Sequence, residues 1–253
     1  MTKKKDRINP HIKTVISIVL LVAFWWMMSV ILTESVLPSP WVTVRYMYED
    51  FISGELMPQI GITLFRVLKA FIFTMVIGIA AGCILGLSRT AGLLFDNWIV
   101  IGQSVPPLVL IIVVFLGMGL SEVSAVVAAV LTTVFTIIQN IEQGVRAIDR
   151  DLIEMGYSLK ANKRLMLQKI ILPQIYPYIM ASARFGLSLT WKMVIFVEQM
   201  GRSNGVGFSI NHWYQMYNMG HVLSYSLAFI LVMLIIEMIL GKIVEPLLFR
   251  WQR

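Results

Sequence analysis

The sequence predicts an all-α, polytopic membrane protein with six transmembrane helices. Hydrophobic residues make up 58% of its 253 residues and the mean hydropathy is +0.78, both well above what is usual for a soluble domain. Several apolar runs reach about 18 residues or more, which is the length of a membrane span. These runs are apolar on all sides, whereas the strands of a membrane β-barrel alternate apolar and polar residues. The sequence therefore favours a helical bundle.

The predicted spans each have a length that crosses a hydrocarbon core of about 30 Å at a helical rise of about 1.5 Å per residue. In order they are Thr14–Leu32, Leu64–Leu87, Trp98–Leu116, Val123–Ile141, Pro173–Val197 and Ser224–Val244. They form one transmembrane domain over residues 14–244, between a basic tail over 1–13 and a second tail over 245–253. The first run is long for a signal-peptide core and no small-x-small cleavage site follows it, so we expect an uncleaved span.

The distribution of lysine and arginine predicts the orientation of the loops. With the N-terminus in the cytoplasm, fifteen of the 21 basic residues lie on that side and only two, Arg45 and Arg202, lie outside. Cytoplasmic loops of membrane proteins carry this excess of positive charge. We therefore expect cytoplasmic N- and C-termini and a cytoplasmic segment Asp149–Leu172. The same rule accounts for the net charge of +7 without a nucleic-acid partner.

The first outer loop has a pattern of its own. Leu37-Pro38-Ser39-Pro40 predicts a rigid turn, because proline fixes φ and biases the residue before it to an extended conformation. An amphipathic helix at the membrane surface is expected to follow over Val42–Ile52. The aromatic residues expected at the interface are Trp41, Tyr46, Tyr48 and Phe51.

Small residues and prolines mark two of the spans. Gly78, Gly82 and Gly86 repeat at a four-residue spacing in the second span, which favours close helix packing over a ligand role. Pro106-Pro107 removes backbone hydrogen bonds in the third span and should kink or interrupt it. The sequence leaves open whether this proline pair is a packing kink or part of a pathway lining.

Charged residues within spans are costly in a membrane and are functional candidates by default. The candidates are Arg66, Lys69, Arg184 and Lys192, together with Glu198 at the end of the fifth span and Glu237 deep in the sixth. Arg66 and Lys69 lie near the outer end of the second span, where they either reach the headgroups or line a pathway. Arg184 should lie near the middle of the bilayer and face protein or water. Glu198 is six residues from Lys192, too far for a one-turn pair, so pairing across helices is expected, either in a buried structural pair or along a pathway.

The sequence offers no group of residues typical of an enzyme. His11 lies in the tail, and His212 and His221 lie nine residues apart in the last outer loop, where we expect solvated side chains and no metal site. No Gly-rich phosphate loop precedes a helix, so an ATP-driven process would need its ATP and Mg on a separate chain. Two alternatives stay open: a membrane-embedded enzyme acting on lipid through Glu198, Glu237 and the outer histidines, and a secondary transporter, although no inverted repeat is visible.

The longest polar interruption of the chain is Asp149–Pro177, which is rich in lysine and arginine. A short amphipathic helix is expected over Leu152–Lys160, lying parallel to the membrane. Its apolar side would be formed by Leu152, Ile153, Met155 and Leu159.

This central segment resembles the EAA loop of the permease subunits of bacterial ABC importers. That family has Glu-Ala-Ala, then three residues and a glycine, and a Leu-Pro pair further on. The residues at or beside the motif positions, which the resemblance assigns to coupling with an ATPase, are Glu154, Met155, Gly156, Leu159, Lys160, Ala161, Leu172 and Pro173. Met155 and Gly156 replace the two alanines, and Lys160 replaces the glycine. Because that glycine permits a sharp turn between two short helices, Lys160 puts the turn geometry in question.

Other parts of the chain resemble, in the same order, the branch of this family that imports nitrate, sulfonates, taurine, bicarbonate and thiamine precursors. The matching stretches are Leu37–Pro40, Thr63–Leu68, Pro106, Phe115–Gly119, Asn140, Gly144–Arg146, Asp149, Trp191, Glu198, Gly205–Phe208 and Trp251. The resemblance implies the fold of a type I importer (MetI-like) permease in the bacterial inner membrane.

The resemblance also implies partners and a mechanism. The short helix would insert into a groove on an ATP-binding subunit, two such subunits would drive a homodimer of permeases, and this chain would carry no cofactor itself. A periplasmic or lipid-anchored binding protein would deliver a small solute to the loops around Leu37–Met57 and Arg202–His221. Residues expected along the pathway are Arg66, Pro106, Arg184, Lys192 and Glu198.

Overall fold

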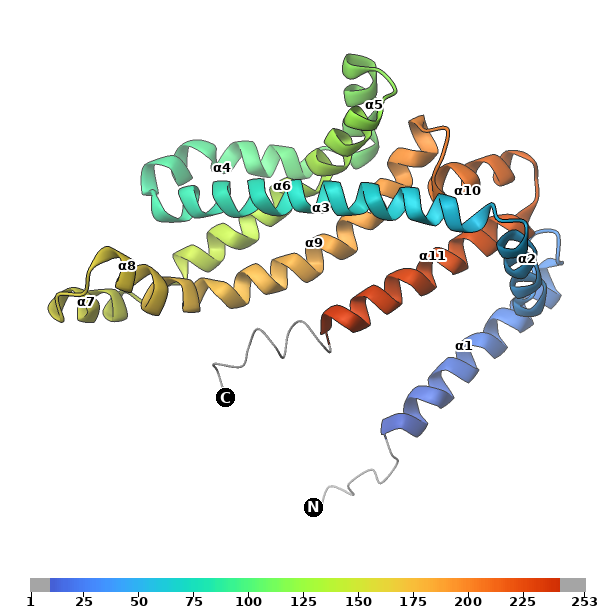
Figure 1. Ribbon diagram of the computed structural model, residues 1–253, viewed down its shortest axis with the longest axis horizontal. Helices are drawn as coiled ribbons and strands as arrows, with labels where there is room; N and C mark the ends of the chain where they lie inside the picture. Colours follow the sequence, from blue (N-terminus) through green and yellow to red (C-terminus); the bar gives the residue numbers. More distant parts are fainter. Residues whose placement is uncertain (1–9, 242–253) are drawn as a thin grey trace. The chain divides into compact units, whose positions relative to one another are not determined.

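A computed structural model describes residues 10–241, with side chains from Ile12 onward, and every regular element among these residues is a helix (Figure 1). The C-terminal tail, most of the N-terminal tail, the end of the sixth predicted span and Trp251 lie outside the described residues. The chain divides into two units, residues 59–208 and residues 1–58 with 209–253. The predicted all-α class is confirmed.

The unit of residues 59–208 contains the central helices of the chain. In chain order they are α3 (Leu56–Leu87), α4 (Arg89–Ser104), α5 (Pro107–Met118), α6 (Glu122–Arg146), α7 (Arg150–Ser158), α8 (Lys163–Met166), the π-helical turn η1 (Leu167–Ile171) and α9 (Leu172–Gly201). Helix α6 is the centre of this unit, because it packs against α4, α5 and α9. Its N-terminus is closed by a capping box in which Ser121 and Ser124 bind each other's backbone N–H groups.

Helices α3 and α6 approach closely along the predicted row of glycines. A Cβ atom on Gly78 would lie 2.5 Å from the Ile137 side chain, and one on Gly82 would lie 2.7 Å from the Ile138 carbonyl oxygen. Such distances are too short for a real side chain, so the glycines are required for this approach. The packing role that the sequence favoured for them agrees with this contact.

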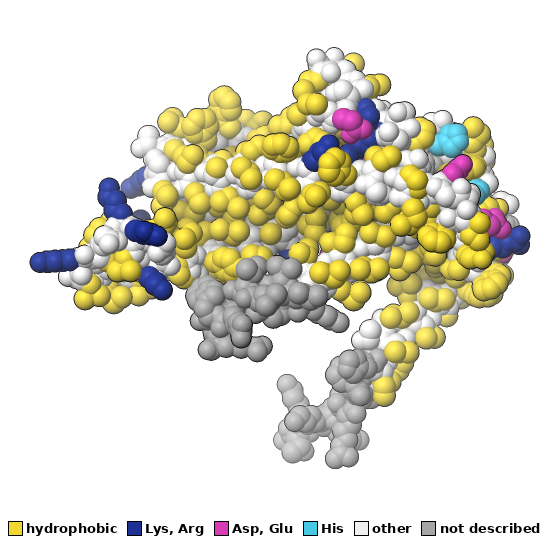
Figure 2. All heavy atoms as spheres, in the orientation of Figure 1, with side chains coloured by type: hydrophobic (Ala, Val, Ile, Leu, Met, Phe, Trp, Pro, Cys, Tyr) yellow, Lys and Arg dark blue, Asp and Glu magenta, His cyan; other side chains and the backbone are white. Residues whose placement is uncertain are grey.

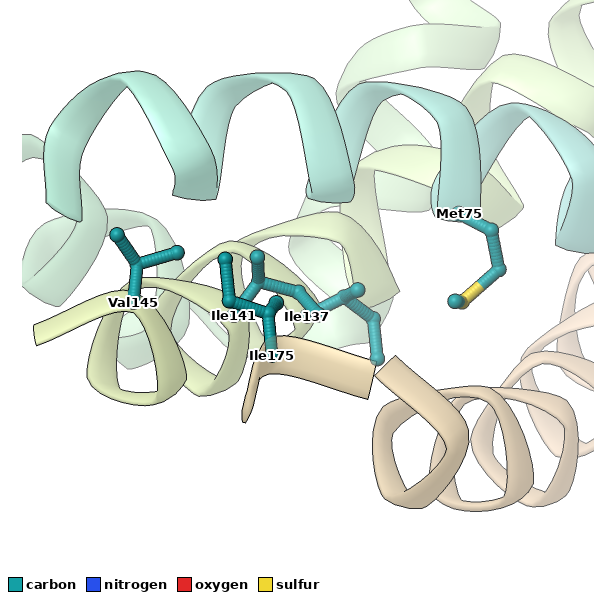
Figure 3. Packing of buried hydrophobic residues seen from close by; sticks show 5 residues of the cluster. All are labelled: Met75, Ile137, Ile141, Val145 and Ile175. Carbon is teal, nitrogen blue, oxygen red and sulfur yellow. The ribbon is translucent and has the colours of Figure 1, made fainter. Parts of the chain in front are cut away.

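The core of this unit is an apolar cluster with contributions from three helices. Met75 from α3, Ile137, Ile141 and Val145 from α6, and Ile175 from α9 are all buried there (Figure 3). One polar contact accompanies it, a hydrogen bond of 3.0 Å between the hydroxyls of Thr74 and Thr133. Interhelical hydroxyl pairs of this kind stabilise helix contacts in lipid, where water offers no alternative partner.

The other unit contains α1 (Pro10–Leu32), α2 (Pro40–Ile52), most of α10 (Val206–Gln215) and α11 (Met219–Ile239). Helix α2 begins two residues before the predicted Val42, with Ser39 as N-cap and Pro40 in the first turn. It packs against α11. The buried Asp50 of α2 accepts a hydrogen bond of 2.5 Å from the Ser224 hydroxyl and lies 2.8 Å from Nδ1 of His221. His221 is therefore a partnered residue in α11, and the expectation that it is a solvated loop residue is wrong.

Five helices of the described residues are long and apolar enough to span a membrane, and α4 with α5 would make a sixth if the pair is one span. The third predicted span is not one straight helix, because α4 and α5 meet at a bend of 96°. Pro106 and Pro107 lie at this bend and remove two N–H donors, so the helix is interrupted. The second span begins at Leu56 rather than Leu64, because helix continues into a more polar stretch that hydropathy does not count.

Apolar side chains cover most of the visible surface of residues 59–208 (Figure 2). Basic side chains gather at the end formed by α7 and α8, and a smaller mixed group of charges lies at the other end of the unit. These two polar ends are the candidate functional regions.

Candidate functional site: the coupling segment and the charge cluster

The segment Asp149–Pro177, called the coupling segment below, begins with the predicted short helix. Helix α7 covers Arg150–Ser158, close to the predicted 152–160. Asp149 is its N-cap, since the Asp149 carboxylate accepts a hydrogen bond of 2.9 Å from the Asp151 N–H. The acidic Asp151 in the first turn also suits the positive end of the helix dipole.

The sharp turn after α7 is present although lysine replaces the glycine of the related loops. Lys160 has φ of 52°, in the left-handed region that glycine adopts most easily. The Lys160 N–H donates to the Tyr157 carbonyl at 2.9 Å, and the Ala161 N–H donates to the Gly156 carbonyl at 3.0 Å. These two bonds form a Schellman motif. The turn is therefore kept, with the strain of a side chain at a left-handed position.

The only glycine of α7, Gly156, allows this helix to pack closely against the start of the next span. Gly156 is buried, and a Cβ atom there would collide with the side chains of Met166 and Ile170. Gln174 makes a second connection: its Oε1 accepts the Asp149 N–H at 2.8 Å, and its Nε2 donates to the Ile170 carbonyl at 3.0 Å. The departure from the second alanine of the family motif thus creates space for Met166.

The outer side of α7 exposes an apolar edge. Leu152 is 38% exposed, Met155 50% and Leu159 74%, and their spacing of three and four residues places them on one face. Ile153 was predicted on the same side, but it is half-buried and does not belong to the exposed edge. Glu154 is exposed beside the apolar edge.

The coupling segment continues into α9 without a break in the helix. Residues Lys163–Gly201 form one helical run in which η1 is a π-helical turn. Pro173 is the second residue after η1. It cannot donate a backbone hydrogen bond, and its ring would crowd a regular preceding turn. The wider π turn accommodates the proline. Leu172-Pro173, predicted as the end of the loop, is accordingly the start of α9.

A charge cluster lies near the other end of α9, away from the coupling segment. It is formed by Thr63 and Arg66 of α3, Glu122 of α6, Glu198 of α9, and Asn204. The Arg66 side chain is only 2% exposed and that of Glu198 is fully buried, with 2.6 Å between Arg66 Nη1 and Glu198 Oε1. Arg66 Nε donates to Glu122 at 2.8 Å, and its Nη atoms also reach Glu122 and both oxygens of Asn204. All five N–H donors of the guanidinium therefore have acceptors.

The contacts in the charge cluster test the predictions made for Glu198 and Arg66. Glu198 pairs across helices as predicted, and its basic partner is Arg66. Arg66 does not extend to the headgroups, because its guanidinium is enclosed by the cluster. Glu122 additionally accepts a bond of 2.8 Å from Arg202. The pair is thus buried and structural in this conformation, and a pathway role for either residue stays a prediction.

The Gly205-Val206-Gly207 sequence is shaped around the Glu198 carboxylate. The Gly207 N–H donates to Glu198 Oε2 at 2.8 Å, and the Thr63 hydroxyl donates to the same oxygen at 2.9 Å. Gly205 has φ of 102°, and a Cβ atom there would collide with the carboxylate. The glycines allow the backbone to come close enough to bind a buried charge.

The remaining predicted pathway residues are not brought into this cluster. Pro106 is exposed at the α4–α5 bend. Arg184 and Lys192 lie along α9, and the Lys192 ammonium is 5.7 Å from the centre of the Trp191 ring. Glu122 and Asn204 were not among the predicted site residues, because both lie outside the predicted spans and only the fold places them beside Arg66.

Comparison with known proteins identifies the family. Residues 74–250 match the family model described as the inner membrane component of binding-protein-dependent transport systems. The chain belongs to this family. It is a multi-pass membrane permease component, a transporter rather than an enzyme, so the alternative of a lipid-modifying enzyme is wrong.

Individual relatives point to the same branch that the sequence resembles. The chain is 33% identical to the aliphatic sulfonates transport permease protein SsuC of Escherichia coli, over 74% of this chain and 72% of that protein. It is 29% identical to SsuC of Bacillus subtilis, over 71% of this chain and 65% of that protein. Identity with the nitrate import permease protein NrtB of Synechococcus elongatus is 28%, over 86% of this chain and 80% of that protein.

Solved structures support the predicted MetI-like fold. The permease superposes on a chain of the MetNI methionine ABC transporter in an inward-facing conformation with a TM-score of 0.64, covering 75% of this chain and 94% of that chain at 20% identity. A chain of an amino acid ABC transporter gives a TM-score of 0.63 at 14% identity, covering 82% of this chain and 98% of that chain.

Proposed function

We propose that this permease is the membrane subunit of an ATP-driven importer of small anions, and that α7 is the point at which a separate ATP-binding subunit drives it. The observation that carries the proposal is the apolar edge of Leu152, Met155 and Leu159, exposed on a helix in a strongly basic, polar segment. An exposed apolar edge on a short helix is suited to insertion into a groove of a partner protein.

The packing behind α7 gives this contact a mechanical consequence. Gly156 and Gln174 fix α7 to the start of the run that continues as α9, and α9 carries Glu198 near its other end. A displacement of α7 would therefore move α9 as a rigid element and act on the charge cluster. ATP-dependent closure of two ATP-binding subunits would in this way switch two permease copies between inward-open and outward-open states.

The proposed assembly contains a homodimer of permeases, two ATP-binding subunits that hold ATP and Mg, and an external binding protein. A symmetric pair is the usual arrangement when one chain supplies half of a membrane pathway. The excess of basic residues on one side supports cytoplasmic termini and a cytoplasmic coupling segment. Arg66, Pro106, Arg184, Lys192 and Glu198 remain our candidates for the pathway.

The substrate class is proposed from the relatives. The names of the relatives described above specify aliphatic sulfonates and nitrate. A further relative, 24% identical over 77% of this chain, is the taurine transport system permease protein TauC of Escherichia coli. Sulfonates, nitrate and taurine share a small anionic oxygen-bearing group. We propose a solute of this class. Uptake of labelled nitrate, taurine and an alkanesulfonate by cells that express the complete importer would identify it, and uptake of none of the three would contradict the assignment.

The coupling contact is tested by placing charge on the apolar edge. Met155→Asp and Leu159→Asp should abolish co-purification of the ATP-binding subunit and uptake, while the permease still inserts into the membrane. Ser158→Asp is the matched control, because Ser158 is exposed on the polar side of the same helix. Retention of the ATP-binding subunit by both edge variants would show that it binds elsewhere.

A further inference from the structure

A groove runs along the surface of residues 59–208 between α3 and α6. It has a volume of about 470 Å³ and is lined by Lys69, Phe73 and Ile77 from α3 and by Glu122 and a row of valines from α6. The volume lies in the range of sites that hold small molecules, about 300–1,000 Å³. Neither the transport cycle nor the coupling segment assigns it an occupant.

The walls of the groove are suited to a hydrocarbon chain. Val123 is 64% exposed, Phe73 55% and Ile77 44%, and α3 and α6 are both of spanning length and composition. Water in such a groove would lack the polar partners that it needs. In a membrane the groove is therefore filled by apolar chains, and acyl chains are the apolar groups that surround a spanning helix.

One end of the groove carries charge of a kind that suits a phosphate. Lys69 is half-buried with its ammonium 4.1 Å from the centre of the Phe65 ring, and it lies one turn after Arg66. The Glu122 carboxylate also lines this end, but it is shared by the guanidinium groups of Arg66 and Arg202. With Glu198 included, the three basic and two acidic side chains leave one net positive charge.

The polar end of the groove also lies at the level where headgroups are expected. Glu122 is the first residue of α6, so the charged end coincides with a terminus of a spanning helix. Lys69 lies in the interior of α3, and its flexible stem lets its ammonium extend towards this level.

We propose that this groove binds one anionic phospholipid, with its phosphate at Lys69 and an acyl chain along the valines of α6. Lysine is suited to this role because its ammonium is a compact charge with three donors. The bound lipid braces α3 against α6 directly beside the charge cluster.

The proposal is tested by native mass spectrometry of the full chain in detergent, titrated with either phosphatidylglycerol or phosphatidylcholine. A single lysine contact with an anionic lipid predicts that phosphatidylglycerol binds about fivefold more tightly than phosphatidylcholine. Lys69→Ala should remove this preference. Lys13→Ala is the control, because Lys13 is an exposed lysine of α1 that lies outside the groove, and it should keep the preference.

A second pair of variants tests the acyl chain. Val123→Trp fills the groove and should lower lipid occupancy severalfold, whereas Val76→Trp, on α3 outside the groove and 62% exposed, should leave it unchanged. Equal binding of both lipids to the wild type, or a preference that survives Lys69→Ala, would overturn the proposal. A change of oligomeric mass in Val123→Trp with unchanged lipid occupancy would assign the groove to a second copy of the chain and overturn it as well.

Discussion

Neutralising Glu198 should destabilise the permease far more than neutralising an exposed glutamate. Glu198 is fully buried and accepts hydrogen bonds from Thr63, Arg66 and the Gly207 N–H. Breaking a buried ion pair by changing one partner costs about 3–5 kcal/mol, because the other charge is left uncompensated. Glu122 still binds Arg66 in the variant, so we expect the lower limit for Glu198→Gln, about 3 kcal/mol.

Thermal unfolding of the detergent-purified chain measures this effect. For a chain of this size about 1 kcal/mol shifts Tm by about 2–4 °C, so Glu198→Gln should lower Tm by about 6–12 °C. Glu49→Gln is the control, since Glu49 forms an exposed pair with Arg45 at 2.9 Å, and such pairs contribute about 0–1 kcal/mol. If both variants had the same Tm, the buried ion pair of the charge cluster would not contribute to the stability of the fold.

A double variant distinguishes the contribution of the Arg66–Glu198 ion pair to stability from the effect of changing side-chain volume. Arg66→Met alone leaves Glu198 buried without its cation, whereas Arg66→Met with Glu198→Met leaves no unpaired charge between the two positions. The double variant should therefore be less destabilised than the sum of the single variants by at least about 1 kcal/mol, as expected for contacting residues. Strict additivity of the two Tm changes would refute a direct interaction.

Further predictions concern backbone positions with defined geometry. Lys160→Gly should relieve the left-handed strain after α7, about 1 kcal/mol, and slow hydrogen exchange of α7 severalfold; faster exchange would contradict the Schellman turn. Gly205→Ala should lower Tm clearly more than Gly54→Ala, because both have positive φ but only Gly205 faces a neighbouring side chain, the Glu198 carboxylate. Gly82→Ala should destabilise the α3–α6 contact by about 2 kcal/mol and lower Tm. Gly61→Ala, which meets open space on the same helix, should not lower Tm, because alanine is a better helix former than glycine; equal Tm values would exclude close packing at Gly82.

Much of the fold follows from local sequence patterns. Apolar runs of spanning length locate the membrane helices, since no other structure satisfies the backbone in lipid. The spacing of Leu152, Met155 and Leu159 predicts the apolar edge of α7, and the helix predicted over Val42–Ile52 corresponds to α2. The order of weak motifs along the chain indicates the family that the comparisons confirm.

Other features depend on geometry that no local pattern contains. Pro106-Pro107 predicts an interruption but not a bend of 96°, because the angle depends on how α5 packs against α6 and α9. Lys160 occupies a conformation that favours glycine, and only the hydrogen bonds of the completed turn show that lysine is tolerated there.

The sequence by itself determined which segments enter the membrane, which face of α7 is apolar and which charges lie within spans. The tertiary structure decided how those charges are neutralised. Arg66 and Glu198 are 132 positions apart, and their contact exists only because Arg66 of α3 and the C-terminal end of α9 lie beside the N-terminus of α6. Hydropathy depends on each residue and its neighbours, whereas the stability of a buried charge depends on what the folded chain brings within hydrogen-bonding distance.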